Sequence, residues 1–245
     1  CIFCSANQNI DPEFFQKTEE LGEKKKVPVL HIDADEDHVA LQYLEKKGDV
    51  RQTDGKYKNN CMLNKIVYVY EGIEREGPKS KRRRLVRPYY FCGSYPGEDN
   101  RKLWDEVAEY IESHYDEKSL KKVFLNADGG SWIEAGKETI RKVVPVLDEF
   151  HLSKYLVSMT HFLGDSAEDA RRELRDAIKG DDIGEFISVC GKILYYTEDP
   201  AVIRRIEKGR AYIEANWNAA VRRYAARDII YGCSAEGHVS HVLSA

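Results

Sequence analysis

The sequence predicts an α/β fold in which a mixed sheet of five strands is combined with a block of helices. Three observations predict it. Short apolar runs and alternating patterns that are typical of strands come first along the chain. Helical spacing then alternates with apolar strands up to about residue 150, and only helical spacing follows. The predicted order of elements in the sheet is β-β-β-α-β-α-β.

The first half of the chain predicts three consecutive strands. After a short charged helix over residues 11–26, Pro28 begins an extended segment that continues to about Gln42. Two further strands are expected at Asn64–Tyr70 and Leu85–Cys92, joined by a basic turn that contains glycine and proline. Three consecutive strands of this kind favour an antiparallel meander.

The second half of the sheet alternates helices with strands. A helical face from residue 99 onward comprises Leu103, Trp104, Val107, Ile111 and Tyr115. Strands are expected at 122–126 and 143–147, on either side of a helix over 131–142. A helix between two apolar strands indicates a parallel pair with a right-handed crossover.

Four segments are expected along the chain. They are an N-terminal flank at 1–27, a sheet-containing core at 28–150, an all-α insertion at 151–232 and the start of a final segment at 233–245. The chain begins at Cys1 and stops within what resembles a structured segment, so we expect a longer parent protein. Cys1 and Cys4 form half of a zinc-knuckle pattern, but no second half lies nearby.

Charge limits how the protein could contact a polyanion. The net charge of −4 excludes a generally basic nucleic-acid coat, so DNA contacts would need local patches. The candidate residues are Lys81, Arg82, Arg83, Arg84, Arg222 and Arg223. The alternative for each patch is a solvated surface. No apolar run is long enough for a membrane helix and no signal peptide opens the chain, so we expect a cytoplasmic protein without membrane contact.

Three acidic residues stand in elements that could bring them together. Asp35 lies on the first predicted strand, Asp128 closes a later strand, and Glu236 follows the helical stretch. Carboxylate oxygens are preferred ligands of Mg²⁺, and three of them can hold two ions beside a phosphate. A meander followed by parallel strands, with acids at these places, matches the ribonuclease-H-like arrangement.

Four local sequences narrow this interpretation. HIDADEDHVALQ, NADGGSWI, VLDEFHL and CSAEGHVSHVLS resemble the ISLre group of bacterial insertion-sequence transposases, which are distantly similar to Mutator-like transposases. The resemblance spans about residues 27–245. It implies a DDE transposase with Asp35, Asp128 and Glu236 as catalytic and metal-binding triad and two Mg²⁺ or Mn²⁺ ions as cofactors. It also implies DNA, both element ends and target, as substrate, and a homo-oligomer in the active complex.

The resemblance also assigns neighbouring residues. Asp33 is the alternative first carboxylate, since both aspartates share strand parity. Asp35 is preferred because its spacing to Val39 resembles the Asp-Gly-x-x-Val start of the family. Asp148 and His151 resemble a supporting Asp-x-x-His element and imply a positioning role. Their alternative is an aspartate that caps a helix and a histidine that pairs with it.

Two other functions remain open at this point. The Asp33-x-Asp35 pattern after a strand also fits a haloacid-dehalogenase-like phosphatase, with Asp33 as nucleophile and Asp35 as acid/base. The context of the later acidic residues argues against it. A third hypothesis is a DNA-binding or assembly module that keeps the same fold without catalysis.

Overall fold

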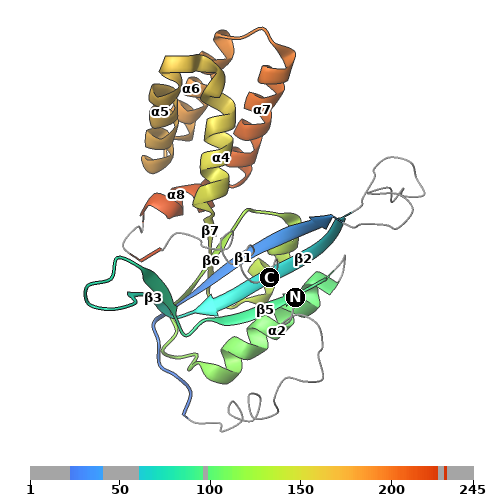
Figure 1. The fold of residues 1–245 in the computed structure, drawn as a ribbon, viewed down its shortest axis with the longest axis vertical. Coiled ribbons are helices and arrows are strands. Elements are labelled where there is room, and N and C mark those ends of the chain that lie inside the picture. The colour runs from blue at the N-terminus through green and yellow to red at the C-terminus, as the bar shows by residue number, and fades with distance from the viewer. Residues whose placement is uncertain (1–22, 41–60, 96–98, 226–228, 231–245) are drawn as a thin grey trace, which may run out of the picture. The chain divides into compact units, whose positions relative to one another are not determined.

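The structure is a computed structural model that describes residues 23–40, 61–95, 99–225 and 229–230 (Figure 1). Glu236, Cys1 and Cys4 lie outside the described residues. The described residues divide into two compact units. The sheet unit comprises 23–40, 61–95, 99–125 and 130–144, and the helical unit comprises 126–129, 145–225 and 229–230. The helical unit therefore begins earlier than the predicted boundary after residue 150, and it also includes residues 126–129.

Five strands form one mixed sheet in the order β5-β2-β1-β6-β7. Their bounds are β1 (Val29–Ala40), β2 (Cys61–Tyr70), β5 (Tyr89–Gly93), β6 (Lys122–Ala127) and β7 (Val143–Leu147). β2 pairs antiparallel with both β1 and β5, which confirms the meander. A helix connects the neighbouring strands β6 and β7, as a parallel crossover requires.

The predicted strand at Leu85–Cys92 is wrong, because two separate strands occupy this region. β3 (Gly72–Arg75) and β4 (Arg83–Val86) form a two-stranded antiparallel hairpin of their own, and β5 begins only at Tyr89. The break falls at Arg87, whose φ of 50° is left-handed, and at Pro88, which has no N–H to donate. The basic turn is therefore the tip of a hairpin.

The segment before β1 differs from the predicted charged helix where it is described. Lys25 forms an isolated parallel bridge with Tyr115. Its N–H donates to the His114 carbonyl at 2.9 Å, and its carbonyl accepts from Asp116 N–H at 2.8 Å. Residues 23–26 are thus fixed in non-helical backbone by the end of the following helix. Residues 11–22 lie outside the described part of the chain.

The core of the sheet unit contains the predicted face of α2 (Asp99–His114). Leu103, Trp104 and Val107 are completely buried, together with strand residues such as Leu30 and Ile32. α3 (Ser131–Thr139) packs closely on α2, because a Cβ added at Gly136 would lie 2.6 Å from the Trp104 ring. The Trp104 indole N–H donates to the Trp132 carbonyl at 2.9 Å, which satisfies its buried polar atom.

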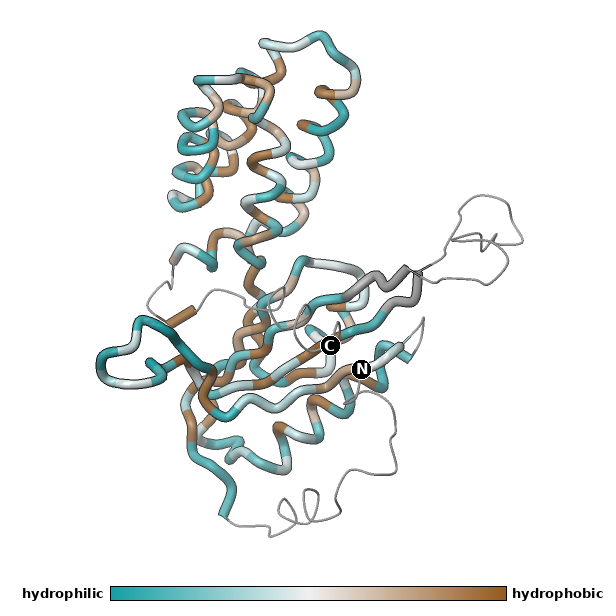
Figure 2. Tube along the Cα trace, viewed as in Figure 1, coloured by the Kyte–Doolittle hydropathy of each residue, from teal (hydrophilic) through white to brown (hydrophobic). Residues whose placement is uncertain are grey.

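The helical unit contains five α-helices in its described residues, where the sequence predicts an all-α insertion without specifying the number of helices. They are α4 (Glu149–Thr160), α5 (Ala167–Lys179), α6 (Ile183–Tyr195), α7 (Pro200–Ala215) and α8 (Trp217–Ala225), with a 3₁₀ helix at His161–Ser166. Hydrophobic and hydrophilic residues alternate along them (Figure 2), as expected for helices that share one core. Asp199 caps α7 by accepting from Ala201 N–H at 2.8 Å. No helix in the described ranges is long and apolar enough to cross a membrane.

Candidate functional site

The two aspartates of β1 lie in different environments although they share strand parity. Asp33 is completely buried. Its carboxylate accepts hydrogen bonds from the hydroxyls of Tyr68 at 2.8 Å and Tyr70 at 3.2 Å, both from β2. Burial and the charge of Asp33 raise the pKa of Tyr90. Two neutral donors therefore stabilise the Asp33 carboxylate inside the sheet unit.

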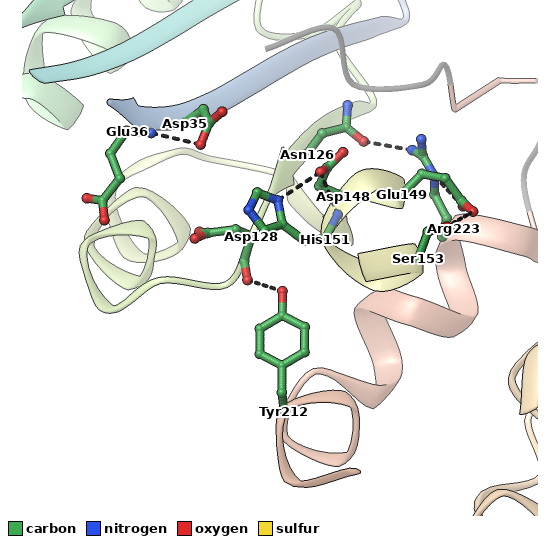
Figure 3. Close-up of polar contacts among 10 residues, drawn as sticks. All are labelled: Asp35, Glu36, Asn126, Asp128, Asp148, Glu149, His151, Ser153, Tyr212 and Arg223. Atoms are coloured by element: carbon green, nitrogen blue, oxygen red, sulfur yellow. Dashed lines mark hydrogen bonds and ion pairs between the residues drawn. The ribbon is translucent and has the colours of Figure 1, made fainter. Parts of the chain in front are cut away.

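Asp35 lies two residues further along β1 and is only half-buried. One carboxylate oxygen accepts the N–H of Glu36 at 2.9 Å (Figure 3). Asp35 stands opposite Ile66 in the register with β2, so the facing residue of that strand offers no polar side chain. Of the two aspartates on this strand, Asp35 is the one whose carboxylate is partly exposed.

Asp128 directly follows β6 in a short stretch that belongs to the helical unit. We call residues 126–129 the strand-end segment. The carbonyl of Ala127 accepts the Asp148 N–H at 2.9 Å, and the Tyr212 hydroxyl donates to the Asp128 carbonyl (Figure 3). The Asp128 side chain is half-buried. Main-chain hydrogen bonds thus fix the backbone that carries this carboxylate.

Asp148 and His151 form a bonded pair at the start of α4. Asp148 is buried and caps the helix, accepting from the His151 N–H at 3.1 Å and the His151 Nδ1 at 2.9 Å (Figure 3). Burial favours the neutral form of this carboxyl, but the hydrogen bonds and charge of His151 outweigh it and lower the Asp148 pKa. The two residues therefore form a helix cap and its partner, and their positioning role stays a prediction. The pair also fixes the orientation of the imidazole ring.

Tyr212 contacts the strand-end segment from α7. Its ring stacks on Tyr155 with centroids 4.0 Å apart. Burial and the charges of Asp128 and Asp148 raise the pKa of Tyr212 above its ordinary value. The hydroxyl therefore stays protonated at neutral pH and acts as a hydrogen-bond donor.

The two arginines of α8 differ from the expectation that both contact DNA. Arg223 is 6% exposed, donates to Asn126 Oδ1 at 3.2 Å and lies 3.6 Å from Glu149 Oε2 (Figure 3). A buried guanidinium with partners in its own unit is unsuited to a surface phosphate contact, so we revise the assignment of Arg223. Arg222 is exposed, with one long hydrogen bond of 3.4 Å to the Pro145 carbonyl.

The hairpin carries the densest exposed positive charge. Lys81, Arg82, Arg83 and Arg84 are all exposed. Arg84 pairs with Glu74 across the hairpin at 2.7 Å. Among the described residues, the side chains of Lys81, Arg82 and Arg83 have no ion-pair partner, so their charge remains available to a polyanion.

Sequence reasoning missed the residues that surround the candidate acids. Tyr68 and Tyr70 lie in a predicted strand and Tyr212 lies on a predicted helical face, and the sequence pattern predicts no role for Asn216. The i, i+4 spacing of Tyr212 and Asn216 was the available signal, because residues four apart lie on the same side at the end of a helix, and Asn216 directly follows α7.

The predicted triad is only partly within the described chain. Asp35 belongs to the sheet unit, Asp128 to the helical unit, and Glu236 to neither described unit. Among the described residues, no three His, Cys, Asp or Glu side chains lie close enough together to hold a metal ion.

The chain belongs to an uncharacterised protein family, UPF0236, whose model matches residues 9–245. A UPF0236 protein of Caldanaerobacter subterraneus subsp. tengcongensis is 35% identical over 92% of the chain, and a second from the same organism is 36% identical over the same share. A third, named as a UPF0236 protein in the vanSb 3′ region of Streptococcus gallolyticus, is 26% identical over 66% of the chain and 34% of its own length. The chain spans 43% of the length of the first two relatives.

Proposed function

We propose that this chain is part of the catalytic region of a DDE-type transposase, which cleaves and joins DNA strands for an insertion sequence. The observation that carries the proposal is the position of the two aspartates. Asp35 lies on β1 and Asp128 directly follows β6, and β1 and β6 are neighbours in the strand order β5-β2-β1-β6-β7. A meander of three strands followed by two strands joined through a helix is the order expected of a ribonuclease-H-like sheet.

The chemistry of the proposed donors fits magnesium. Asp35, Asp128 and Glu236 offer only carboxylate oxygens, which Mg²⁺ and Mn²⁺ prefer. Asp35 and Asp128, the two of these residues that the structure describes, are half-buried. Two ions in such a set would supply charge neutralisation at a scissile phosphate and lower the pKa of an attacking hydroxyl.

The protein residues would supply position and orientation. Asp35 is fixed by a strand in the middle of the sheet and Asp128 by its main-chain hydrogen bonds. The Asp148–His151 pair would support the same edge, because Asp148 N–H bonds the residue before Asp128. Rigid placement of charged groups is the main contribution that a protein makes to phosphoryl transfer.

The hairpin would hold the DNA backbone. Lys81, Arg82 and Arg83 stand exposed at its tip, and phosphate contacts of this kind give affinity that depends on salt and little on sequence. Arg222 could add a contact from the helical unit. The proposal assigns no DNA contact to Arg223.

The names of the relatives agree with a mobile element. One Caldanaerobacter relative carries eleven locus labels in a single name and another carries four. One protein encoded at many places in a genome is what repeated transposition produces. The activity of the whole protein is a proposal, because the chain corresponds to less than half of each of these relatives.

The burial of Asp33 argues against the phosphatase hypothesis. That hypothesis needs Asp33 as an accessible nucleophile, but Asp33 is completely buried and accepts two tyrosine hydrogen bonds. The catalytically inactive module of the same fold remains the competing outcome of the experiment.

The test is a cleavage assay with the intact parent protein and a labelled duplex that contains an element end. We expect strand cleavage that requires Mg²⁺ or Mn²⁺ and disappears in Asp128→Asn, while DNA binding remains. Ser131→Ala is a matched control on the adjacent turn and should cleave normally. DNA binding without metal-dependent cleavage in the wild type would instead support the inactive module.

A further inference from the structure

We propose that Tyr212 of α7 and Asn216, the residue that caps the C-terminal end of this helix, are positioning residues that set the backbone of Asp128, so that the helical unit controls the geometry of this carboxylate. The inference rests on the proposed function in one respect, the metal-binding role of Asp128. The contacts that carry it all lie within the helical unit, which includes the strand-end segment.

The first contact is a hydrogen bond from α7 to the main chain of Asp128. The Tyr212 hydroxyl donates to the Asp128 carbonyl across 84 residues of sequence. Stacking on Tyr155, with ring centroids 4.0 Å apart, fixes the Tyr212 ring that carries the donating hydroxyl. The bond therefore restrains the peptide plane immediately after the aspartate.

The second contact lies one residue further along and one helical turn away. Gly129 has a φ of +79°, which favours glycine, and a Cβ added there would lie 2.5 Å from Asn216 Oδ1. Asn216 is itself fixed, because its side-chain N–H donates to the Tyr212 carbonyl at 3.0 Å. The Asn216 side chain therefore packs directly on the turn that follows Asp128.

A third contact lies on the N-terminal side of Asp128, at Asn126. Asn126 is completely buried, and its Oδ1 accepts from Arg223 of α8. Arg223 in turn lies beside Glu149, the first residue of α4. The strand-end segment is thus contacted before Asp128 by α8 and after it by α7.

These contacts connect the helices to the site. The direction of a side chain follows from its backbone dihedral angles, so a change at the Asp128–Gly129 peptide redirects the carboxylate. Tyr212 lies in the last turn of α7 and Asn216 directly follows that turn, so a displacement of this end of the helix would alter both contacts together. A ligand or partner that shifts α7 would then change the metal affinity of the site.

The decisive variant is Tyr212→Phe, which keeps the stacked ring and removes only the donated proton. In the parent protein we expect faster amide hydrogen exchange in the peptide that spans residues 126–131, a measurement that needs no metal. We also expect Mn²⁺ binding, followed by electron paramagnetic resonance, to weaken on the order of fivefold, as for the loss of one hydrogen bond. Tyr155→Phe is the matched control and should change neither value.

A double-mutant cycle tests the Asn216 contact. Gly129→Ala should weaken Mn²⁺ binding strongly, because it adds a clash with Asn216 to an unfavourable φ. Asn216→Gly in the same chain removes the clash, so the double variant should recover part of the affinity. Strict additivity of the two substitutions would contradict direct packing between these residues.

The outcomes separate this inference from the proposed function. If Asp128→Asn does not weaken Mn²⁺ binding, the metal-binding role of Asp128 is wrong. If Asp128→Asn abolishes binding while Tyr212→Phe matches Tyr155→Phe in both exchange and affinity, the site stands and the positioning role is wrong. Faster exchange at residues 126–131 with unchanged Mn²⁺ affinity would likewise overturn control of the carboxylate by α7.

Discussion

β1 and the segment from residue 126 to 151 each hold one buried and one half-buried aspartate, but different contacts fix the aspartates in the two regions. Each contains one aspartate whose carboxylate is bonded inside its unit and one whose carboxylate is half-buried. On β1, tyrosine hydroxyls bind Asp33, while Asp35 is partly exposed. In the second region, Asp148 caps a helix and binds His151, and Asp128 is fixed through its own main chain.

The difference lies in what supports the half-buried carboxylate. Asp35 lies on a long central strand whose backbone is fixed by pairing with β2. Asp128 follows the end of a strand, and its support comes from α7, far along the sequence. We therefore expect substitutions in α7 to change the geometry of Asp128 and to leave that of Asp35 unchanged. Burial also separates Asp33 and Asp148 from the half-buried Asp35 and Asp128.

The largest expected effect is a loss of DNA cleavage, and it should distinguish Asp35 from Asp33 on β1. Asp35→Asn in the parent protein should reduce metal-dependent DNA cleavage at least about 100-fold, because the amide keeps the shape and removes the charge that would hold the metal. DNA binding should be nearly unchanged. Asp33→Asn should affect cleavage much less and instead lower the melting temperature, since it weakens hydrogen bonds to a buried charge. Both variants are measured by gel-based cleavage and calorimetry, and the reverse pattern would mean that Asp33 is the reacting carboxylate.

The buried start of β1 predicts a dependence of stability on pH. His31 is 2% exposed and stacks between Tyr70 and Phe124, and burial lowers its pKa to about 4. The unfolded chain binds a proton below about pH 6.5, while the folded chain resists it down to about pH 4. Stability should therefore be complete above pH 6.5 and fall by up to roughly 3 kcal/mol towards pH 4.

Chemical unfolding at several pH values measures this slope. His31→Phe keeps an aromatic ring between its neighbours and removes the titrating group, so its slope between pH 6.5 and 4 should be smaller than that of the wild type. Equal slopes in both proteins would show that other groups cause the acid sensitivity.

The basic residues of the hairpin also differ in their contacts, because Arg84 pairs with Glu74 while Lys81, Arg82 and Arg83 are exposed. Replacing Lys81, Arg82 and Arg83 by alanine should weaken DNA binding on the order of tenfold or more for every sequence. It should also reduce the slope of log affinity against log salt by about 3, one unit for each lost phosphate contact. Arg84→Ala is the control within the hairpin, because Arg84 already pairs with Glu74. Unchanged salt slopes in the triple variant would mean that DNA binds elsewhere.

The smallest expected effect is the loss of stability on substitution of Asp148, the buried aspartate that caps α4. Asp148→Ala should lower the free energy of unfolding by about 1 kcal/mol through loss of a helix cap. Asp182→Ala removes the cap of α6, which accepts the Glu185 N–H at 2.8 Å, and is the matched control for stability. Cleavage should fall in Asp148→Ala only, because only that variant also frees the His151 ring. Equal cleavage in both variants would mean that Asp148 only caps α4 and has no positioning role.

Local patterns predicted most of the sheet and the helical block. Alternation along Asn64–Tyr70 and the spacing of the α2 face reflect burial on one side of an element, which a sequence records directly. The strand at Leu85–Cys92 failed because a single left-handed residue, Arg87, and the following proline divide it. The single pattern of basic residues around Arg222 and Arg223 could not show that only one of them is exposed.

The site was less predictable because its support is non-local. Asp33 and Asp35 have the same parity, so only the tyrosines of β2 distinguish them. The bond from Tyr212 to Asp128 joins residues 84 positions apart, and no local pattern encodes it. Sequence resemblance identified candidate carboxylates, whereas their surroundings required the fold.

The most direct test of the central claim is a crystal structure of the parent protein with Mn²⁺ and a short DNA duplex, read from anomalous scattering. We predict two peaks about 3.5–4 Å apart, coordinated by Asp35, Asp128 and Glu236 beside a DNA phosphate. A structure in which Glu236 lies on the opposite side of the sheet from Asp128, or in which the peaks avoid these three carboxylates, would contradict the assignment.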